Sequence, residues 1–226
     1  MDLLFTRANR DPASPLAQTV LVDEFLFAST ETGEIGELGW SFTNGTANLI
    51  GAPEVDHPGA IARASSAVSS AVASTYSGGG GTTVALRYDQ VSEMTWIVKP
   101  ATDGADFDLR FGLLSDMTSA TPTNGAYFEK LAADTNWFGV GRVGGVQTRT
   151  DTGVAMSVNW FRLKMRRASN TVVAFSVNGG AEVLVSSNAP LAANTMVFGF
   201  QIIPTTANAR TVNVDFFSMK LTAQAR

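Results

Sequence analysis

Acidic side chains are the first residues to consider for catalysis, because hydrolysis of a glycosidic bond uses two carboxyl groups. One protonates the leaving oxygen while the other attacks or activates water, so the pair must share a site. Asp106 and Asp108 are two residues apart in an alternating stretch and would share one strand face. Arg110 would lie on that face and pair with Asp108, and the pattern Glu-x-Asp-x-x-Glu does not occur. These acids therefore indicate surface charge. The other acids considered are weaker candidates: Asp89, Glu93 and Asp215.

His57 is the single histidine, so any catalytic triad or imidazole-based metal site would have to use it. It stands in His57-Pro58-Gly59, where proline fixes φ and glycine frees it, which is typical of a turn at a strand end. A Gly-x-Ser-x-Gly nucleophile elbow is absent. Glu54 and Asp56 could join His57 in a metal site, but they crowd it on one short loop. We therefore predict a structural turn, with no metal and no cofactor.

Exposed aromatic rings can stack on sugars, and four tryptophans are available for this role: Trp40, Trp96, Trp137 and Trp160. Most tryptophans in strand patterns fill the core of a sandwich, so packing is the first interpretation. Trp137 stands beside Asn136 near the start of a predicted strand. These two residues are therefore the best candidates for a glycan-binding site.

The elements that must position these side chains are β-strands. In Phe107–Leu113 apolar residues fall at every second position, separated by two charged residues and a glycine. This two-residue period is that of a strand with one buried face. Trp160–Arg167 repeats the pattern and places a basic row on its polar face, formed by Arg162, Lys164 and Arg166. Such a row is typical of a solvated strand face, and it could also pair with an acidic face of a neighbouring subunit.

Short strands separated by turn signals extend over most of the chain. Asn44-Gly45, Asn178-Gly179 and Gly144-Gly145 fit tight hairpins, because Asn and Gly tolerate positive φ. Ala60–Ser74 could form a short helix, but its valines and serines favour extended structure. Gly78–Gly81 is interpreted as a flexible loop. This pattern predicts an all-β fold, either a sandwich or a barrel. The predicted strands are Val20–Phe27, Leu38–Phe42, Ala47–Ile50, Ala60–Ala64, Thr83–Tyr88, Glu93–Lys99, Asp106–Leu114, Ala126–Leu131, Trp137–Arg142, Val146–Thr150, Asn159–Arg167, Thr171–Val177, Glu182–Val185, Met196–Ile203 and Thr211–Leu221.

The composition limits the possible partners. Of 226 residues, 45% are hydrophobic and only 16% are charged, so part of the surface is expected to be covered by a partner or another copy. The net charge of −4 argues against nucleic acid and against an anionic membrane. The lack of cysteine suits a reducing cytoplasm, and neither a Sec signal nor a membrane-spanning apolar stretch is recognised. We assign residues 1–19 to an extended N-terminal arm and 20–226 to a single β-strand domain.

The order of these features resembles a group of tailed-bacteriophage structural proteins with a concanavalin A-like (lectin/glucanase) jelly-roll. The likeness covers roughly residues 20–222. The features that carry it are Gly39-Trp40, His57-Pro58-Gly59, a Ser/Thr/Gly-rich segment up to Thr83, Phe107–Leu113, Asn124–Glu129, Asn136-Trp137, Asn159–Leu163, Val173–Gly179 and Arg210–Phe217. The resemblance implies a two-sheet antiparallel sandwich on a virion, as a capsid decoration protein, head fibre or tail component.

The main hypothesis is therefore a non-enzymatic virion protein that decorates and cements a capsid. It would bind the major capsid protein or other virion proteins as a homotrimer, on the capsid surface after assembly in the host cytoplasm. The contacts are assigned to Leu4, Phe5, Arg7, Arg10, Arg162, Lys164 and Arg166. The alternative is a lectin-like head-fibre or tail module that binds a host surface glycan through Trp137 and Asn136. A polysaccharide-degrading enzyme is a third possibility, and the missing paired acids argue against it.

Overall fold

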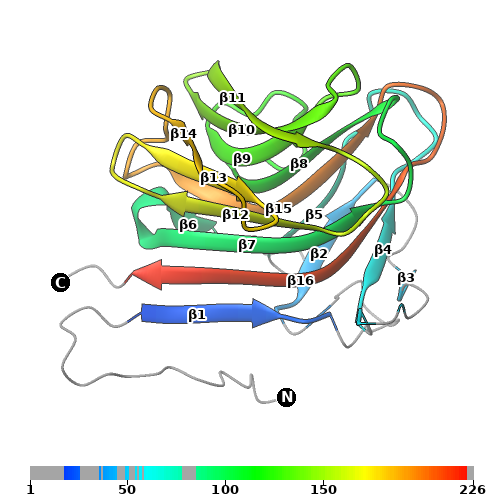
Figure 1. Ribbon diagram of the computed structural model, residues 1–226, viewed down its shortest axis with the longest axis horizontal. Helices are drawn as coiled ribbons and strands as arrows, with labels where there is room; N and C mark the ends of the chain where they lie inside the picture. Colours follow the sequence, from blue (N-terminus) through cyan, green and yellow to red (C-terminus); the bar gives the residue numbers. More distant parts are fainter. Residues whose placement is uncertain are drawn as a thin grey trace.

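The structure is a computed structural model, and it describes residues 18–25, 36, 38–44, 49–50, 54, 56–57, 59–77 and 85–222. In these residues two antiparallel eight-stranded sheets pack face to face (Figure 1). The predicted all-β jelly-roll sandwich is thus confirmed. Among the described residues, none lies in a helix long and apolar enough to cross a bilayer. The predicted arm lies almost wholly outside the described residues, and the first strand already begins at Gln18.

The first sheet, called sheet A here, has β16 near its centre, with β7 on one side and both β4 and β1 on the other. Across the sheet the strands are β14 (Val183–Val185), β13 (Val173–Val177), β12 (Phe161–Arg167), β7 (Val91–Pro100), β16 (Thr211–Thr222), β4 (Ile61–Ala64) and β3 (Leu49–Ile50), and β1 (Gln18–Asp23) pairs with the end of β16. A short 3-10 turn, η1 (Tyr88–Gln90), precedes β7.

The second sheet, sheet B, carries the face on which the candidate site lies. Across the sheet the strands are β11 (Val146–Ala155), β10 (Asn136–Val143), β9 (Gly125–Lys130), β8 (Phe107–Leu114), β15 (Thr195–Pro204), β5 (Ala73–Ser77) and β2 (Trp40–Thr43), and β6 (Ala85–Arg87) pairs with the start of β15. The strand β5 is absent from the predicted set, because Ala73–Ser77 is rich in small polar residues and shows no alternation.

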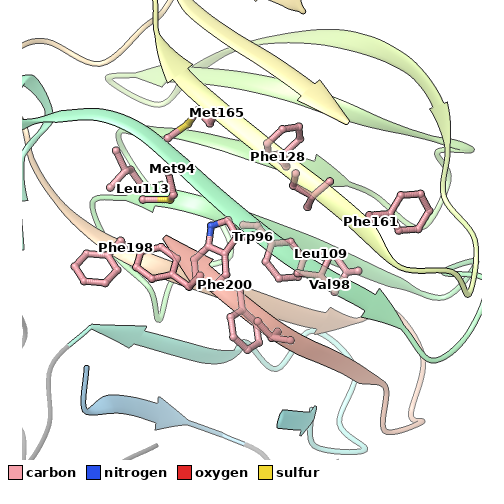
Figure 2. Close-up of a cluster of buried hydrophobic side chains, with 14 of the residues drawn as sticks. Met94, Trp96, Val98, Leu109, Leu113, Phe128, Phe161, Met165, Phe198 and Phe200 are labelled. Atoms are coloured by element: carbon pink, nitrogen blue, oxygen red, sulfur yellow. The ribbon is translucent and has the colours of Figure 1, made fainter. Parts of the chain in front are cut away.

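The core forms between the two sheets from the alternating apolar positions. The inward residues of β8 are Phe107, Leu109, Phe111 and Leu113, and all are fully buried. Figure 2 shows Leu109 and Leu113 in this core. Trp96 of β7 lies opposite, with its ring centroid 5.8 Å from that of Phe111. Alternation therefore fixes which side chains of each strand face outward, and these include the polar strand residues of the site described below.

The turn predictions divide between confirmed and wrong. Gly144 and Gly145 join β10 to β11 as a two-residue loop with φ of 58° and 83°, as predicted. β13 and β14 also pair, but through the longer loop 178–182. The predicted hairpin at Asn44 is wrong, because β2 pairs with β5 in sheet B while β3 pairs with β4 in sheet A. Asn44 does take a positive φ, as expected for a turn residue. The predicted pairing of the two flanking strands is the part that is wrong. The segment Gly78–Gly81 lies outside the described residues.

The connection between β8 and β9 folds over the outer face of sheet B, and residues 115–124 are called the covering loop here. Met117 is almost fully buried and packs in a small cluster with outward residues of the sheet: Leu114, Tyr127, Val140 and Val197. Because an apolar side chain from a loop fills this second cluster, the outer face of sheet B has a partly buried floor rather than an open surface.

Candidate functional site

Three rows of outward-facing side chains cross the outer face of sheet B, because pairing sets residues of neighbouring strands side by side. From β15 through β8, β9 and β10 to β11 the rows are Gln201–Arg110–Glu129–Phe138–Asp151, Gly199–Gly112–Tyr127–Val140–Arg149 and Val197–Leu114–Gly125–Arg142–Gln147. Charged and amide groups gather over β8 to β11, and the glycines lie beside tyrosines. Sheet register thus brings together residues that are far apart in the sequence.

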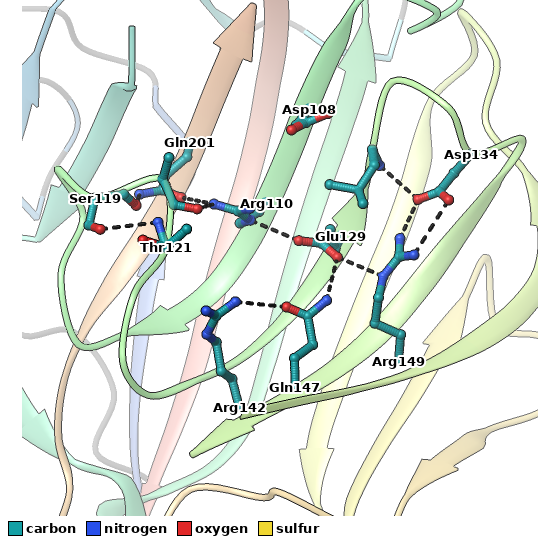
Figure 3. Close-up of polar contacts among 12 residues, drawn as sticks. Asp108, Arg110, Ser119, Thr121, Glu129, Asp134, Arg142, Gln147, Arg149 and Gln201 are labelled. Carbon is teal, nitrogen blue, oxygen red and sulfur yellow. Dashed lines mark hydrogen bonds and ion pairs between the residues drawn. The ribbon is translucent and has the colours of Figure 1, made fainter. Parts of the chain in front are cut away.

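Glu129 lies at the centre of the polar contacts (Figure 3) and is 1% exposed. Its Oε1 accepts a hydrogen bond from Arg110 Nε at 2.9 Å, and its Oε2 lies 2.7 Å from Arg149 Nε. Gln147 Nε2 also donates to Oε2 at 3.1 Å. A buried carboxylate is tolerated only when paired and hydrogen-bonded, and both oxygens of Glu129 meet that condition. The group is held in place as part of the frame of the site.

Arg149 carries the network to the edge of the sheet. It pairs with Asp134 and its guanidinium carbon lies 4.1 Å from the centre of the Phe138 ring. Burial alone would lower the pKa of Arg149, but the carboxylates of Asp134 and Glu129 more than offset burial and the pKa is raised. Asp134 in turn accepts from the backbone amide of Leu131 at 2.9 Å. This end of the site is therefore rigid and charged.

Arg110 and Gln201 hold the covering loop at the other end. Arg110 Nη1 donates to the carbonyl of Ala120 at 2.8 Å, and Gln201 Nε2 donates to the carbonyls of Met117 and Ser119 at 2.9 and 3.0 Å. Gln201 Oε1 accepts from Arg110 Nη1 at 3.1 Å. These bonds satisfy loop carbonyls that would otherwise be buried without partners.

A depression of about 190 Å³ lies at the edge of the covering loop. Its lining combines an aromatic ring, apolar groups and hydroxyl and carboxylate groups, from Tyr76, Ser115, Asp116, Met117, Thr118 and Val197. Asp116 Oδ1 accepts from both the backbone amide and the hydroxyl of Thr118, at 2.7 and 2.8 Å, so the polar rim is ordered. Within the described residues, no group of three or more His, Cys, Asp and Glu side chains could hold a metal ion.

The predicted glycan-binding pair is not placed for binding. Trp137 is 0% exposed and packs in the core between Phe111 and Phe161, with ring centroids 6.1 and 5.7 Å away. Asn136 donates to both carboxylate oxygens of Asp151 at 3.0 Å. The choice of Trp137 is therefore wrong, because on β10 it takes an inward position. Trp40 and Trp96 are likewise buried in the core.

The predicted pairing of Asp108 with Arg110 is also wrong. Asp108 Oδ1 accepts from the backbone amide of Ala132 at 2.7 Å, while Arg110 reaches across to Glu129 on the neighbouring strand. Asp106 precedes β8 and pairs with Arg210. A cross-strand neighbour at the same register is closer than a residue two positions along the same strand, which explains the difference.

His57 lies in a separate cluster at the outer face of sheet A. Its backbone amide donates to the carbonyl of Glu54, in agreement with a turn, and its Nδ1 lies 2.7 Å from Asp215 Oδ2. The ring of His57 stacks on Trp160 with 3.9 Å between centroids. Glu54 accepts from Trp160 Nε1 at 3.0 Å and from Lys99 at 2.6 Å. Asp215 lies at a register shift in β16, and such a bulge redirects a side chain.

The predicted contact residues divide between described and undescribed segments. Arg162 is exposed, whereas Lys164 pairs with Glu93 and Arg166 pairs with Glu182. Two members of the basic row are thus neutralised within the chain. The remaining predicted contacts, in residues 1–17, lie outside the described residues: Leu4, Phe5, Arg7 and Arg10.

Sequence reasoning missed most of the outer-face site. Glu129, Arg149 and Gln201 were not singled out, and the covering loop was not expected. One signal was present: Tyr127-Phe128-Glu129 alternates, so Glu129 had to share a face with Tyr127. The partners of Glu129 depend on how β8, β10 and β11 are aligned with β9. This register cannot be predicted from the sequence of a single strand.

Comparison with known proteins extends these observations. A family model described as SO2946-like, C-terminal domain, matches residues 56–215. A protein of unknown function, SO2946 from Shewanella oneidensis MR-1, has a similar structure, with a TM-score of 0.66 and 16% identity over 92% of this chain and 90% of that chain. A β-glucanase from Bacillus licheniformis is similar with a TM-score of 0.57 and 12% sequence identity, over 88% of this chain and 97% of that chain. SCLam, a non-specific endo-β-1,3(4)-glucanase of family GH16, is similar with a TM-score of 0.55 and 10% sequence identity, over 92% of each chain. No curated protein matches the chain.

These neighbours establish the concanavalin A-like fold and correct one expectation. The conclusion that the chain is not an enzyme is overturned, because several similar structures are glucanases or other glycoside hydrolases. That conclusion rested on the lack of paired acids, of a nucleophile elbow and of cysteine. The outer face of sheet B carries acids from different segments, Asp108, Glu129 and Asp134, and each of them is hydrogen-bonded or ion-paired within the chain.

Proposed function

The chain belongs to the SO2946-like, C-terminal domain family, and since it shares its fold with glucanases we propose that it binds a polysaccharide across the outer face of sheet B. The ligand would extend from the depression that β5, β15 and the covering loop line, across the outer face towards β8 to β11. The fold shared with glucanases suggests a polysaccharide as the ligand, and the residues of this chain suggest where it binds.

The observation that carries the proposal is the composition of that face. The depression beside the covering loop offers the half-buried ring of Tyr76 next to Ser115, Asp116 and Thr118. A flat apolar ring bordered by hydroxyl and carboxylate groups matches a sugar, which has apolar faces and hydroxyl edges. At about 190 Å³ the depression is smaller than the ~300–1,000 Å³ of typical drug-sized sites. It would therefore hold one ring of a longer polymer.

Ion pairs within the chain occur on both outer faces. On sheet A, Glu93 pairs with both Lys164 and Lys220, and Arg166 pairs with Glu182. The depression beside the covering loop is the feature that makes the outer face of sheet B the better supported one.

The test is binding to a panel of neutral and acidic polysaccharides, measured by affinity electrophoresis and calorimetry. Tyr76→Ala should weaken binding at least about tenfold, because it removes the ring that lines the depression. Trp160→Ala is the matched control, since it removes the accessible aromatic ring of the His57 cluster. Unfolding curves of both variants establish that each is folded. Retention of full affinity by Tyr76→Ala would place the ligand elsewhere.

Hydrolysis is measured on the same panel, because several structural neighbours are glucanases. Release of reducing ends would identify the bound polymer as a substrate. Glu129→Gln and Asp108→Asn would then separate the contributions of the acids on this face. Failure of every polysaccharide in the panel to bind would overturn the proposed function.

A second candidate is a role on a bacteriophage virion, as a capsid decoration protein that binds the major capsid protein as a homotrimer. The observation that favours it is β1, where Val20 and Val22 are 40% and 42% exposed on the strand that pairs with the end of β16. Exposed valines on such a strand suit contact with another protein. The sequence resemblance to phage structural proteins agrees with this candidate.

Deletion tests this second candidate. Because β1 begins at Gln18, residues 1–17 can be removed without cutting the strand. The deletion should weaken attachment to virions, and Val20→Ser with Val22→Ser should weaken it further. Equal decoration of virions by all three proteins would refute a role for the arm and β1 in attachment.

A further inference from the structure

Arg142 differs from the other arginines of the outer-face network because it lacks a carboxylate partner. Arg110 pairs with Glu129, and Arg149 pairs with Glu129 and Asp134. For Arg142 the described residues provide no ion pair, and its Nη1 donates to the amide oxygen of Gln147 at 2.8 Å. The side chain is nevertheless partly buried, and its Nε is buried without a hydrogen-bond partner. A cation withdrawn from water without an anion is energetically unfavourable.

A second unpartnered polar group lies beside it. Tyr127 is 0% exposed, and its hydroxyl is buried without a hydrogen bond of acceptable geometry in the described part of the chain. Burial raises the pKa of Tyr127, and Glu129 adds to the rise, while the neighbouring Arg110 and Arg142 partly offset it. The hydroxyl therefore remains a neutral donor at physiological pH. Arg142 lies close enough to act as a donor to the Tyr127 oxygen, so the hydroxyl proton and the rest of the guanidinium are the donors left without an acceptor at this end of the face.

The backbone shows that this arrangement is built into the sheet. Gly125 lies directly opposite Arg142 in the register of β9 and β10. A Cβ at Gly125 would approach the ring of Tyr127 to 2.6 Å, so the ring occupies the space that a side chain at 125 would fill. The tyrosine thus leans over its own strand towards Arg142.

Gln147 fixes the orientation of the arginine. Its Nε2 donates to Glu129 Oε2 at 3.1 Å, so its Oε1 must face Arg142, which donates to it (Figure 3). Nη1 of the guanidinium is thereby committed and Nε is buried, so Nη2 is the nitrogen left to donate to an acceptor outside the chain. A carboxylate or sulfate oxygen would accept a charge-assisted hydrogen bond from it.

We propose that Arg142, oriented by Gln147 and flanked by the Tyr127 hydroxyl, binds the anionic group of an acidic polysaccharide. This inference rests on the proposed function and specifies its ligand class. Carboxylate and sulfate groups both present negatively charged oxygens that accept hydrogen bonds from a guanidinium, and neutral glucans have no such group. The anion would supply the acceptor that Arg142 lacks within the chain.

The test compares Arg142→Gln with Arg162→Gln on three ligands: polygalacturonate, dextran sulfate and neutral laminarin. Arg162 is an exposed arginine on sheet A, so its variant makes the same change of charge away from the site. The wild-type protein should bind at least one acidic polymer more tightly than laminarin. Arg142→Gln should lose at least about tenfold in affinity for that polymer, because charge-assisted hydrogen bonds are lost. Arg162→Gln should change it less than about twofold.

The outcomes distinguish this inference from the proposed function. Binding of laminarin alone, or an equal loss from both variants, would overturn the Arg142 subsite and leave polysaccharide binding intact. Binding of no polymer would overturn the proposed function itself. A preference for polygalacturonate over dextran sulfate would identify carboxylate as the group recognised, and the reverse would identify sulfate. Unfolding curves verify that both variants are folded.

Discussion

Neutralising Glu129 tests the geometry of the outer-face network most severely. In Glu129→Gln the shape of the side chain is kept and its charge is removed. Arg110, whose side chain is 7% exposed, would then lack its carboxylate, while Arg149 would keep Asp134. Removing one partner of a buried ion pair costs about 3–5 kcal/mol. Because Gln201 and the Ala120 carbonyl still accept from Arg110, we expect about 3 kcal/mol.

The assay is equilibrium unfolding in urea together with a thermal melt. For a chain of this size, about 3 kcal/mol corresponds to a fall in Tm of roughly 6–12 °C. Glu182→Gln is the matched control, because Glu182 pairs with Arg166 where both side chains are well exposed. Its cost should stay below about 1 kcal/mol.

A double-mutant cycle makes the test specific to the pair. Arg110→Gln combined with Glu129→Gln removes both charges, so the double variant should be less destabilised than the sum of the single variants. Strictly additive effects, or a cost for Glu129→Gln no larger than that for Glu182→Gln, would refute the buried ion pair and with it the frame of the proposed site.

Two further predictions concern other parts of the sandwich. The pKa of Glu93 is lowered: burial opposes this, but hydrogen bonds from Lys164 and Lys220 prevail. Its stabilising effect should be present above the ordinary carboxyl pKa and be lost as the pH falls through the lowered value, so Glu93→Gln should cost up to about 1 kcal/mol at pH 7 and clearly less at pH ~2. Unfolding curves at both pH values check this, and a constant difference would contradict it. Met117→Ala should cost about 2 kcal/mol and speed proteolysis within the covering loop, because it empties the cluster beneath the loop; unchanged cleavage would mean that Met117 does not anchor it.

Much of the architecture could be predicted from local patterns. Phe107–Leu113 and Trp160–Arg167 alternate so regularly that both strands and their buried faces were predicted correctly. Gly144-Gly145 was predicted as a tight turn because two successive residues with positive φ need glycine or asparagine. Ala73–Ser77 was missed because all its residues but Tyr76 are buried and its small polar side chains show no alternation with apolar ones.

The candidate site could not be predicted in the same way, because it depends on pairing between distant strands. Arg110 was recognised as an outward residue, but its partner Glu129 lies on the neighbouring strand, and Gln201 lies 91 residues along the chain. Trp137 and Phe138 are adjacent in sequence and point to opposite faces of β10. Which of them points outward depends on how β10 is oriented in the sheet, and it is Phe138 that lies on the outer face beside Arg149. Local sequence therefore determines which positions share a face, while register determines which residues meet.

Hydrogen–deuterium exchange with and without the tightest-binding polysaccharide tests the central claim most directly. If the ligand lies on the outer face of sheet B, protection should increase in residues 115–124 and in β5, β15 and β8 to β11, and Tyr76→Ala should reduce that protection. Protection confined to β7, β12 and β16 of sheet A, or no change with any polysaccharide, would contradict the account.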